Sequence, residues 1–183
     1  MEVKGIFGPV MFAHYVYLGL VLWSIAFPER RVWPPLEPRS WKYGLSWGVF
    51  VLAAGGDVLL MVRDWNTWLD VGGVRFYAGV PLVVVGLLLL AWGVYTLGVY
   101  RTSGLAGTFV REGPYRFTRN PQYVGDIFLC LGLIGVANSL HATAGLVLLI
   151  LSFVAMPLAE ELWLEEAYGD AYRAYKMTTP RFL

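Results

Sequence analysis

The chain carries, at residues 113–125, the segment Gly113-Pro114-Tyr115-Arg116-Phe117-Thr118-Arg119-Asn120-Pro121-Gln122-Tyr123-Val124-Gly125. This segment is polar and basic, contains two prolines and lies between long apolar runs. Because the chain enters and leaves it through hydrophobic sequence, we expect it to lie at a membrane boundary. The other predicted elements are placed relative to this point.

The composition is that of a membrane protein. Of the 183 residues, 57% are hydrophobic and only 15% are charged, which is unusual for a soluble domain. The aromatic share is 16%, and Trp and Tyr favour the bilayer interface. The single cysteine, Cys130, lies in an apolar run, so we expect no disulfide framework and no metal site. We expect neither a nucleic-acid partner nor a removable signal peptide.

Five apolar runs predict about five transmembrane helices, since a helix needs roughly 20 apolar residues to cross about 30 Å of hydrocarbon. Backbone polar groups in lipid must be hydrogen-bonded within their own segment, so we expect an all-α integral membrane protein with one domain over residues 1–183. The fourth run has roughly 16 residues, which leaves open whether it crosses completely. The five runs cover residues 6–27, 43–62, 76–100, 122–137 and 140–159.

Lys and Arg residues predict the orientation, because cytoplasmic loops carry an excess of them. Of the 14 Lys and Arg residues, all but Lys4, Arg63 and Arg75 fall in loops 28–42 and 101–121 or after the last apolar run. We therefore expect a multi-pass protein with its N-terminus outside and its C-terminus and both polar clusters in the cytoplasm.

Only Asn138 and Ser139 separate the last two apolar runs, which forces an antiparallel helical hairpin. The fourth helix starts at the cytoplasmic face and the fifth returns to it. Asn120 and Glu160 are therefore expected to lie close together, although they are far apart in sequence. Within the second run, residues 44–48 have the small-xxx-small spacing of a helix contact face, with glycine at both ends.

The Asn120-Pro121 pair suits a helix start. Pro121 fits the first turn, where its missing N–H costs nothing, and Asn120 is a good N-cap. A capped helix at the interface is a complete structural explanation of this pair. A functional explanation adds that a helix N-terminus favours an anionic group, and that Tyr115 and Tyr123 offer ring faces to a cationic sulfonium or an adenine.

A second polar cluster follows the last apolar run. Pro157 is expected to kink or loosen the helix just before Glu160 and Glu161. Two adjacent carboxylates at that depth are costly unless solvated or paired, so they either begin the first polar turn outside the lipid or carry chemistry. The tyrosines of residues 168–175 recur at helical spacing, which predicts a cytoplasmic amphipathic helix with packing tyrosines.

Two further ionisable residues, His14 and Asp57, lie inside predicted spans. Both fall in the outer half of the bilayer, roughly 9–12 Å from the external ends at about 1.5 Å per residue. An intramembrane charge is a functional candidate by default. A structural pair, or snorkelling of the side chains to the interface, is nevertheless preferred here, because both residues lie on the opposite side from the polar clusters.

The two polar clusters resemble the sequence blocks of the integral-membrane methyltransferases, which include the isoprenylcysteine carboxyl methyltransferases and the phospholipid N-methyltransferases. Residues 113–125 are similar to the block GPYxxxRHPxYxG. Residues 160–175, followed by Pro180, are similar to the tail EExxLxxxFGxxYxxY…P. The blocks occur in the family's order, and the resemblance covers residues 95–183.

This resemblance implies an enzyme that takes S-adenosyl-L-methionine from the cytosol and methylates a lipid-like acceptor, either a phospholipid amine or an isoprenyl-type molecule. Residues 1–100 would then provide scaffold and substrate access, and residues 101–183 the cofactor-binding loop, the hairpin and the C-terminal helix. Glu160 would lie at the acceptor end of the site. The implied cofactor-binding residues are Gly107, Thr108, Phe109, Val110, Tyr115, Asn120, Pro121, Gln122 and Tyr123.

Glu160, Glu161 and Arg119 are the candidate catalytic residues. A carboxylate can orient an amine acceptor or accept its proton. Towards a carboxylate acceptor the glutamates would be repulsive unless Arg119 or Arg173 screened them.

Two departures from the family pattern narrow the chemistry. Asn120 replaces the usual histidine, which excludes a general base at this position. Met156 replaces the arginine that eukaryotic prenylcysteine enzymes carry one turn before the glutamate, which disfavours carboxyl methylation.

Two other functions are compatible with these features. The membrane sterol reductases share a related C-terminal architecture and bind NADPH, although their chains typically contain more spans. A non-enzymatic membrane scaffold would use the charged clusters only to set its topology. Binding of S-adenosylmethionine or its product, compared with NADPH, separates the three functions.

Overall fold

The computed structural model describes residues 2–183 and contains no β-strand within that range. Short helical turns, α4 (Val99–Thr102), η1 (Pro28–Arg30) and η2 (Gly113–Arg116), lie in the connections. The all-α prediction is confirmed. The long helices are α1 (Val3–Ala26), α2 (Trp41–Arg63), α3 (Val74–Leu97), α5 (Pro121–Ala137) and α6 (Leu140–Thr178).

Helices α1, α2, α3 and α6 are long and apolar enough to cross a membrane, by length and composition. They indicate an integral membrane protein. Helix α5 has 17 residues and is shorter than these four, so a fifth crossing stays a prediction.

Helix α6 runs for 39 residues and continues past its predicted end at residue 159. The backbone within α6 departs from helical angles at Gly169, where φ is 52°, and the kink or loosening at Pro157 stays a prediction. A positive φ is inexpensive for glycine. The predicted C-terminal helix is therefore continuous with α6 up to this break.

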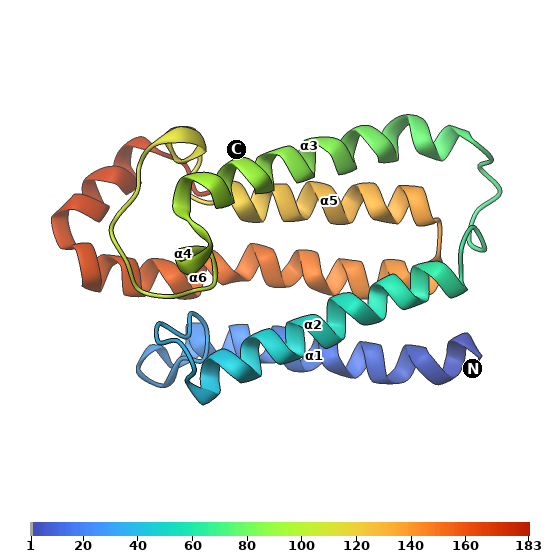
Figure 1. Cartoon of the computed structure of the whole chain (residues 1–183), viewed down its shortest axis with the longest axis horizontal. Coiled ribbons are helices and arrows are strands. Elements are labelled where there is room, and N and C mark those ends of the chain that lie inside the picture. Colours follow the sequence, from blue (N-terminus) through green and yellow to red (C-terminus); the bar gives the residue numbers. More distant parts are fainter. Residues whose placement is uncertain (1) are drawn as a thin grey trace.

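Figure 1 shows α3, α5 and α6 stacked in that order, with α1 and α2 on the far side of α6. The N-terminus, the α2–α3 loop and the α5–α6 turn lie together at one end, which we call the hairpin end (Figure 1). The α1–α2 loop, the α3–α5 connection and the end of α6 lie at the other, which we call the cavity end.

Helices α3 and α5 pack backbone to backbone through glycines. A Cβ atom at Gly86 would lie 2.6 Å from the backbone nitrogen of Leu129, and one at Gly132 would lie 2.6 Å from that of Val83. Small residues permit such close approach of membrane helices. Gly44 and Gly48, in contrast, face open space, so the predicted contact face in α2 is wrong.

Helix α6 packs against α1 and α2 through an apolar core that includes Leu60 and Phe153. Within this core, His14 Nε2 lies 3.0 Å from Asp57 Oδ1, and both residues are 1% exposed. A Cβ atom at Gly145 would lie only 2.0 Å from the same carboxylate oxygen. The predicted pairing of His14 with Asp57 is therefore confirmed, and a glycine of α6 makes room for it.

The hairpin end is held by Asp64, which follows the last residue of α2. Its Oδ2 accepts a hydrogen bond from Ser139 Oγ at 2.6 Å and lies 2.9 Å from His141 Nδ1, and its Oδ1 accepts one from Thr67 Oγ1 at 2.7 Å. Burial disfavours the charged carboxylate, but these hydrogen bonds outweigh it and hold the pKa of Asp64 at about 2. The α5–α6 turn is thereby bound to α2.

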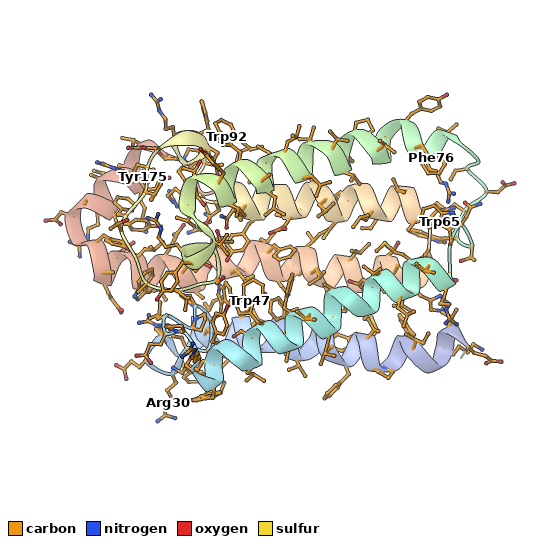
Figure 2. All side chains as sticks on the ribbon, in the orientation of Figure 1. Arg30, Trp47, Trp65, Phe76, Trp92 and Tyr175 are labelled. Atoms are coloured by element: carbon orange, nitrogen blue, oxygen red, sulfur yellow. The ribbon has the colours of Figure 1, made fainter. Side chains whose placement is uncertain are left out.

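The side chains are distributed as in a membrane-spanning bundle (Figure 2). Trp65 and Phe76 lie at the hairpin end, and Trp92 lies towards the cavity end. Between these levels, large apolar side chains such as Val51 and Leu88 are exposed. Aromatic residues at both levels and apolar residues between them match the two interfaces of a bilayer.

Candidate functional site

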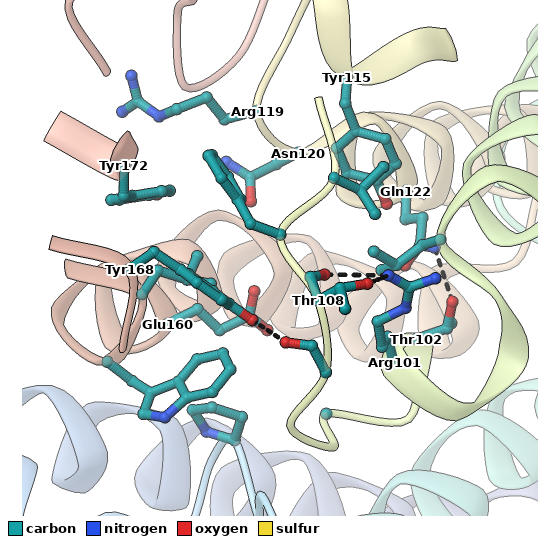
Figure 3. A pocket seen from close by; sticks show the side chains of 18 of the residues that line it. Arg101, Thr102, Thr108, Tyr115, Arg119, Asn120, Gln122, Glu160, Tyr168 and Tyr172 are labelled. Atoms are coloured by element: carbon teal, nitrogen blue, oxygen red, sulfur yellow. Dashed lines mark hydrogen bonds between the residues drawn. The ribbon is translucent and has the colours of Figure 1, made fainter. Parts of the chain in front are cut away.

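A cavity lies at the cavity end, between the α3–α5 connection and the last turns of α6 (Figure 3). It is lined by side chains from the segments 97–110 and 160–175 and by Tyr115 of η2, Arg119, Asn120, Gln122 and Tyr123, and Pro34 of the α1–α2 loop closes one side. Its empty space is about 830 Å³, counting the part open to solvent. Aromatic side chains with a few polar and charged groups line it, which is the usual lining of a small-molecule site.

The structure brings most of the predicted site residues to this cavity, including the Asn120 and Glu160 that the hairpin was expected to bring together. Pro121 does not line the cavity and is fully buried at the start of α5. Glu161 does not line it either. The predicted residues on the cavity wall are Gly107, Thr108, Phe109, Val110, Tyr115, Arg119, Asn120, Gln122, Tyr123 and Glu160.

The carboxylate of Glu160 is held only by neutral donors. Trp33 Nε1 donates to its Oε1 at 2.8 Å, and Tyr123 Oη donates to the same oxygen. Among the described residues, no Lys or Arg forms an ion pair with Glu160. Its carboxyl group is therefore held in one orientation with no cation paired to it, and it borders the cavity.

The neighbouring Glu161 has the opposite environment. Arg119 Nη2 and Arg181 Nε each donate to its Oε1 at 2.8 Å, and Arg181 Nη2 donates to its Oε2 at 2.8 Å. The hydrogen bonds to this carboxylate raise the pKa of the Arg181 guanidinium above its ordinary value. Glu161 thus fixes the C-terminal tail to the start of α5.

Four aromatic side chains form one wall of the cavity. Phe109 stacks on Tyr168 with ring centroids 5.2 Å apart, and it meets Tyr172 and Tyr175 edge to face. Tyr175 Oη donates to the carbonyl of Tyr115 at 2.6 Å. The tyrosines predicted to pack on a surface helix therefore pack against the α3–α5 connection and line the cavity as well.

Asn120 occupies the N-cap position of α5, but its side chain makes no cap hydrogen bond. Its Nδ2 instead donates to the carbonyl of Arg181 at 3.0 Å. The predicted side-chain cap is therefore wrong, because the C-terminal tail takes this amide. Pro121 occupies the first helical turn as predicted.

Burial raises the pKa of the Tyr115 phenol above its ordinary value. Tyr115 therefore stays neutral and keeps its hydroxyl proton. On the cavity wall it can offer a ring face and a hydrogen-bond donor.

Sequence reasoning missed two residues of the site. Trp33 lies in the proline-rich α1–α2 loop, which had been read only as a connection, and it reaches Glu160 from 127 positions away. Arg101 had served only as a topology marker, yet it lines the cavity and donates from Nη1 to Thr108 Oγ1 at 2.6 Å. A tryptophan and an arginine close to lipid boundaries are common, so neither carried a distinctive signal.

Known proteins support a family assignment. The cobalt-zinc-cadmium resistance protein CzcN of Cupriavidus metallidurans is 33% identical over 105 residues, which are 57% of this chain and 45% of that protein. The chain therefore spans less than half the length of this relative. No solved structure gives a significant match. The sequence model of the phospholipid methyltransferase family matches residues 74–171, which contain the α3–α5 connection and both glutamates. The resemblance seen in the two polar clusters is thus confirmed, and the chain belongs to the phospholipid methyltransferase family.

Proposed function

We propose that this protein is an S-adenosylmethionine-dependent membrane methyltransferase that acts on a lipid-like acceptor. The observation that carries the proposal is the shared cavity at the cavity end. It joins the segment implied to bind the cofactor, residues 107–123, to Glu160, which is 37 residues further along the chain and comes from another helix. Family membership supports the same reaction class.

The cavity wall suits S-adenosylmethionine. Phe109 and Tyr168 provide stacked ring faces for an adenine, and aromatic faces also attract a sulfonium cation. When bound, this cofactor supplies an electrophilic methyl group whose loss leaves a neutral thioether. A neutral amine acceptor then needs alignment with this methyl group, exclusion of water, and a group that takes the proton which the amine loses on methylation.

Glu160 is the residue we assign to the acceptor. Tyr123 and Trp33 hold its carboxylate in one orientation without neutralising it. It can therefore orient an amine and take up the proton that the amine loses on methylation. Arg119 and Glu161 act by positioning the wall, because they bind each other at 2.8 Å and fix the C-terminal tail.

The surroundings of Glu160 favour an amine acceptor over a carboxylate. Arg119 is already engaged in an ion pair with Glu161, so its guanidinium is not directed at an acidic acceptor. Met156 lies one turn before Glu160 and is buried, and its Sδ accepts a hydrogen bond from Tyr17 Oη at 3.6 Å. A phospholipid amine therefore fits better than an isoprenyl-type acid.

In the membrane, we place the cavity end in the cytoplasm and the N-terminus outside. All Lys and Arg residues except Lys4, Arg63 and Arg75 belong to the cavity end, and an excess of these residues marks the cytoplasmic side. A cytoplasmic cavity has access to S-adenosylmethionine, and an acceptor lipid lies in the adjacent leaflet.

The test uses the purified protein in detergent. Isothermal titration calorimetry should detect binding of S-adenosylhomocysteine and none of NADPH, and a labelled methyl group should then pass from S-adenosylmethionine to an aminophospholipid. Binding of NADPH alone would identify a reductase of the sterol-reductase type. Binding of neither compound would leave a non-enzymatic scaffold.

A further inference from the structure

Two arginines line the cavity, and only one of them forms an ion pair. Arg119 binds Glu161 through Nη2 at 2.8 Å and the carbonyl of Thr179 through Nη1 at 2.6 Å. Figure 3 shows its guanidinium directed away from Arg101 and towards the outer edge of the cavity. Arg101, in contrast, forms no ion pair with any carboxylate of residues 2–183. The cavity therefore contains one fixed positive charge that the protein leaves uncompensated.

Arg101 is held in place by neutral groups. Its Nη1 donates to the carbonyl oxygen of Thr108 at 3.0 Å and to Thr108 Oγ1 at 2.6 Å, and its methylene groups pack against Gly107. Beside it, Gln122 Nε2 donates to Thr102 Oγ1 at 2.8 Å (Figure 3). Within the described chain, Nε and Nη2 of Arg101 have no hydrogen-bond partner. These donors are available to a ligand.

The position of Arg101 indicates which ligand group it meets. Arg101 follows the end of α3, and its guanidinium binds Thr108, which belongs to the segment implied to bind the cofactor. Glu160 comes from α6 and lies on a different side of the cavity in Figure 3. Because the two groups lie on separate sides, Arg101 is placed to meet the methyl donor and Glu160 to meet the acceptor.

We propose that Arg101 binds the α-carboxylate of the methyl donor and so selects donors that carry this group. The inference rests on the proposed function, and it adds a residue and a specificity that this function does not require. The start of α5, next to Gln122, adds a weaker attraction for the same negative charge.

The experiment compares two ligands that differ only in the carboxylate. S-adenosylhomocysteine and its decarboxylated analogue are titrated into the protein in detergent by calorimetry, so the readout is binding and not activity. Arg101→Gln should weaken S-adenosylhomocysteine binding roughly ten- to one-hundredfold, as for the loss of a charged hydrogen-bonded partner, and should leave the analogue nearly unchanged. Arg101→Lys should retain part of the preference, because it keeps the charge and loses the planar fork.

Two controls separate charge recognition from loop structure. Arg116→Gln removes the same charge from an exposed residue of the same connection and should change neither affinity. Thr108→Val removes a hydroxyl of the cavity wall and keeps the guanidinium, so any loss of affinity should be similar for both ligands and the carboxylate preference should remain.

Three results would overturn the inference. If Arg101→Gln weakened the binding of both ligands equally, Arg101 would be a support for the loop. If Arg101→Gln left both affinities intact and raised only the KM for the phospholipid, the charge would belong to the acceptor phosphate. Failure of the unmodified protein to bind either ligand would overturn the proposed function itself, and this inference with it.

Discussion

The two ends of the bundle treat a carboxylate in opposite ways. At the hairpin end, both oxygens of Asp64 are hydrogen-bonded, and its partners come from the α2–α3 loop and from the α5–α6 turn. At the cavity end, Glu160 accepts two hydrogen bonds on one oxygen and borders empty space. The comparison teaches that the completeness of hydrogen bonding separates a carboxylate that fastens helices together from one that remains available to a ligand.

The same contrast appears between two adjacent residues. Glu161 binds Arg119 and Arg181 through both of its oxygens, whereas Glu160 binds no cation among the described residues. A helix turns about 100° per residue, so neighbouring side chains point to different surroundings. One glutamate therefore faces the C-terminal tail and the other faces the cavity.

The largest effect is expected at Glu160. Glu160→Gln keeps an acceptor for Tyr123 and Trp33 but removes the charge and the proton acceptor, so methyl transfer should fall roughly 10²- to 10⁴-fold. The rate of label transfer to lipid gives the answer, with thermal unfolding in detergent as the check on folding. Glu166→Gln makes the same change on the exposed part of α6 and should leave the rate unchanged. An unaffected rate in Glu160→Gln would remove this residue from the chemistry.

A smaller loss is expected when the support of Glu160 is removed. Tyr123→Phe deletes the hydroxyl that donates to Glu160 and keeps the ring stacked on Phe153, so methyl transfer should fall roughly tenfold. Tyr123→Ala should abolish transfer and leave the protein folded. Tyr95→Phe, at an exposed tyrosine, is the matched control for the initial rate. Equal rates in the Tyr123→Phe and Tyr95→Phe proteins would show that the Tyr123 hydroxyl does not support Glu160 in the reaction.

Much of this arrangement could be predicted from local sequence. The two-residue Asn138-Ser139 turn fixes the α5–α6 hairpin, and the hairpin brings Asn120 and Glu160 to one end. Apolar runs longer than a bilayer crossing predict the helices directly. The pairing of His14 with Asp57 followed from the cost of burying either one alone.

Contacts between distant segments could not be predicted in this way. Nothing near Trp33 indicates that its indole reaches Glu160, since the contact depends on how the α1–α2 loop packs on α6. The tail carbonyl of Arg181 likewise takes the Asn120 amide that local rules assign to a cap. The small-xxx-small spacing also predicted a helix contact at Gly44, although the close backbone contact occurs at Gly86. Spacing within one helix does not reveal which helix lies opposite.

A third prediction concerns the hairpin end, where stability should change and ligand binding should not. The pKa of Asp64 is held at about 2, below its ordinary value of 3.8, so its contribution is complete above about pH 4 and is lost as the pH falls through 2. Asp64→Asn should therefore lower the free energy of unfolding at pH 7 by about 2 kcal/mol.

Thermal unfolding in detergent at pH 7 and at pH 3 measures the Asp64→Asn effect. The gap between the variant and the unmodified protein should narrow at pH 3, because protonation removes part of the advantage of the carboxylate. The affinity for S-adenosylhomocysteine, measured well below the unfolding temperature, should match that of the unmodified protein. A weakened affinity would mean that the two ends are coupled.

The smallest effects test that independence along one helix, since α3 places a glycine near each end. A Cβ atom at Gly93 would lie 2.6 Å from Gln122 Cγ, on a residue that lines the cavity, and one at Gly79 would lie 2.8 Å from Val136 Cγ2 near the hairpin end. Both alanine variants should lose about 1–3 kcal/mol of stability through overpacking. Only Gly93→Ala should also weaken the binding of S-adenosylhomocysteine, by roughly a few-fold, since a displacement of Gln122 costs a fraction of the energy of a hydrogen bond. Equal affinities in the two variants, measured by calorimetry, would show that Gln122 does not contact the donor and that its bond to Thr102 serves only to join α4 to α5.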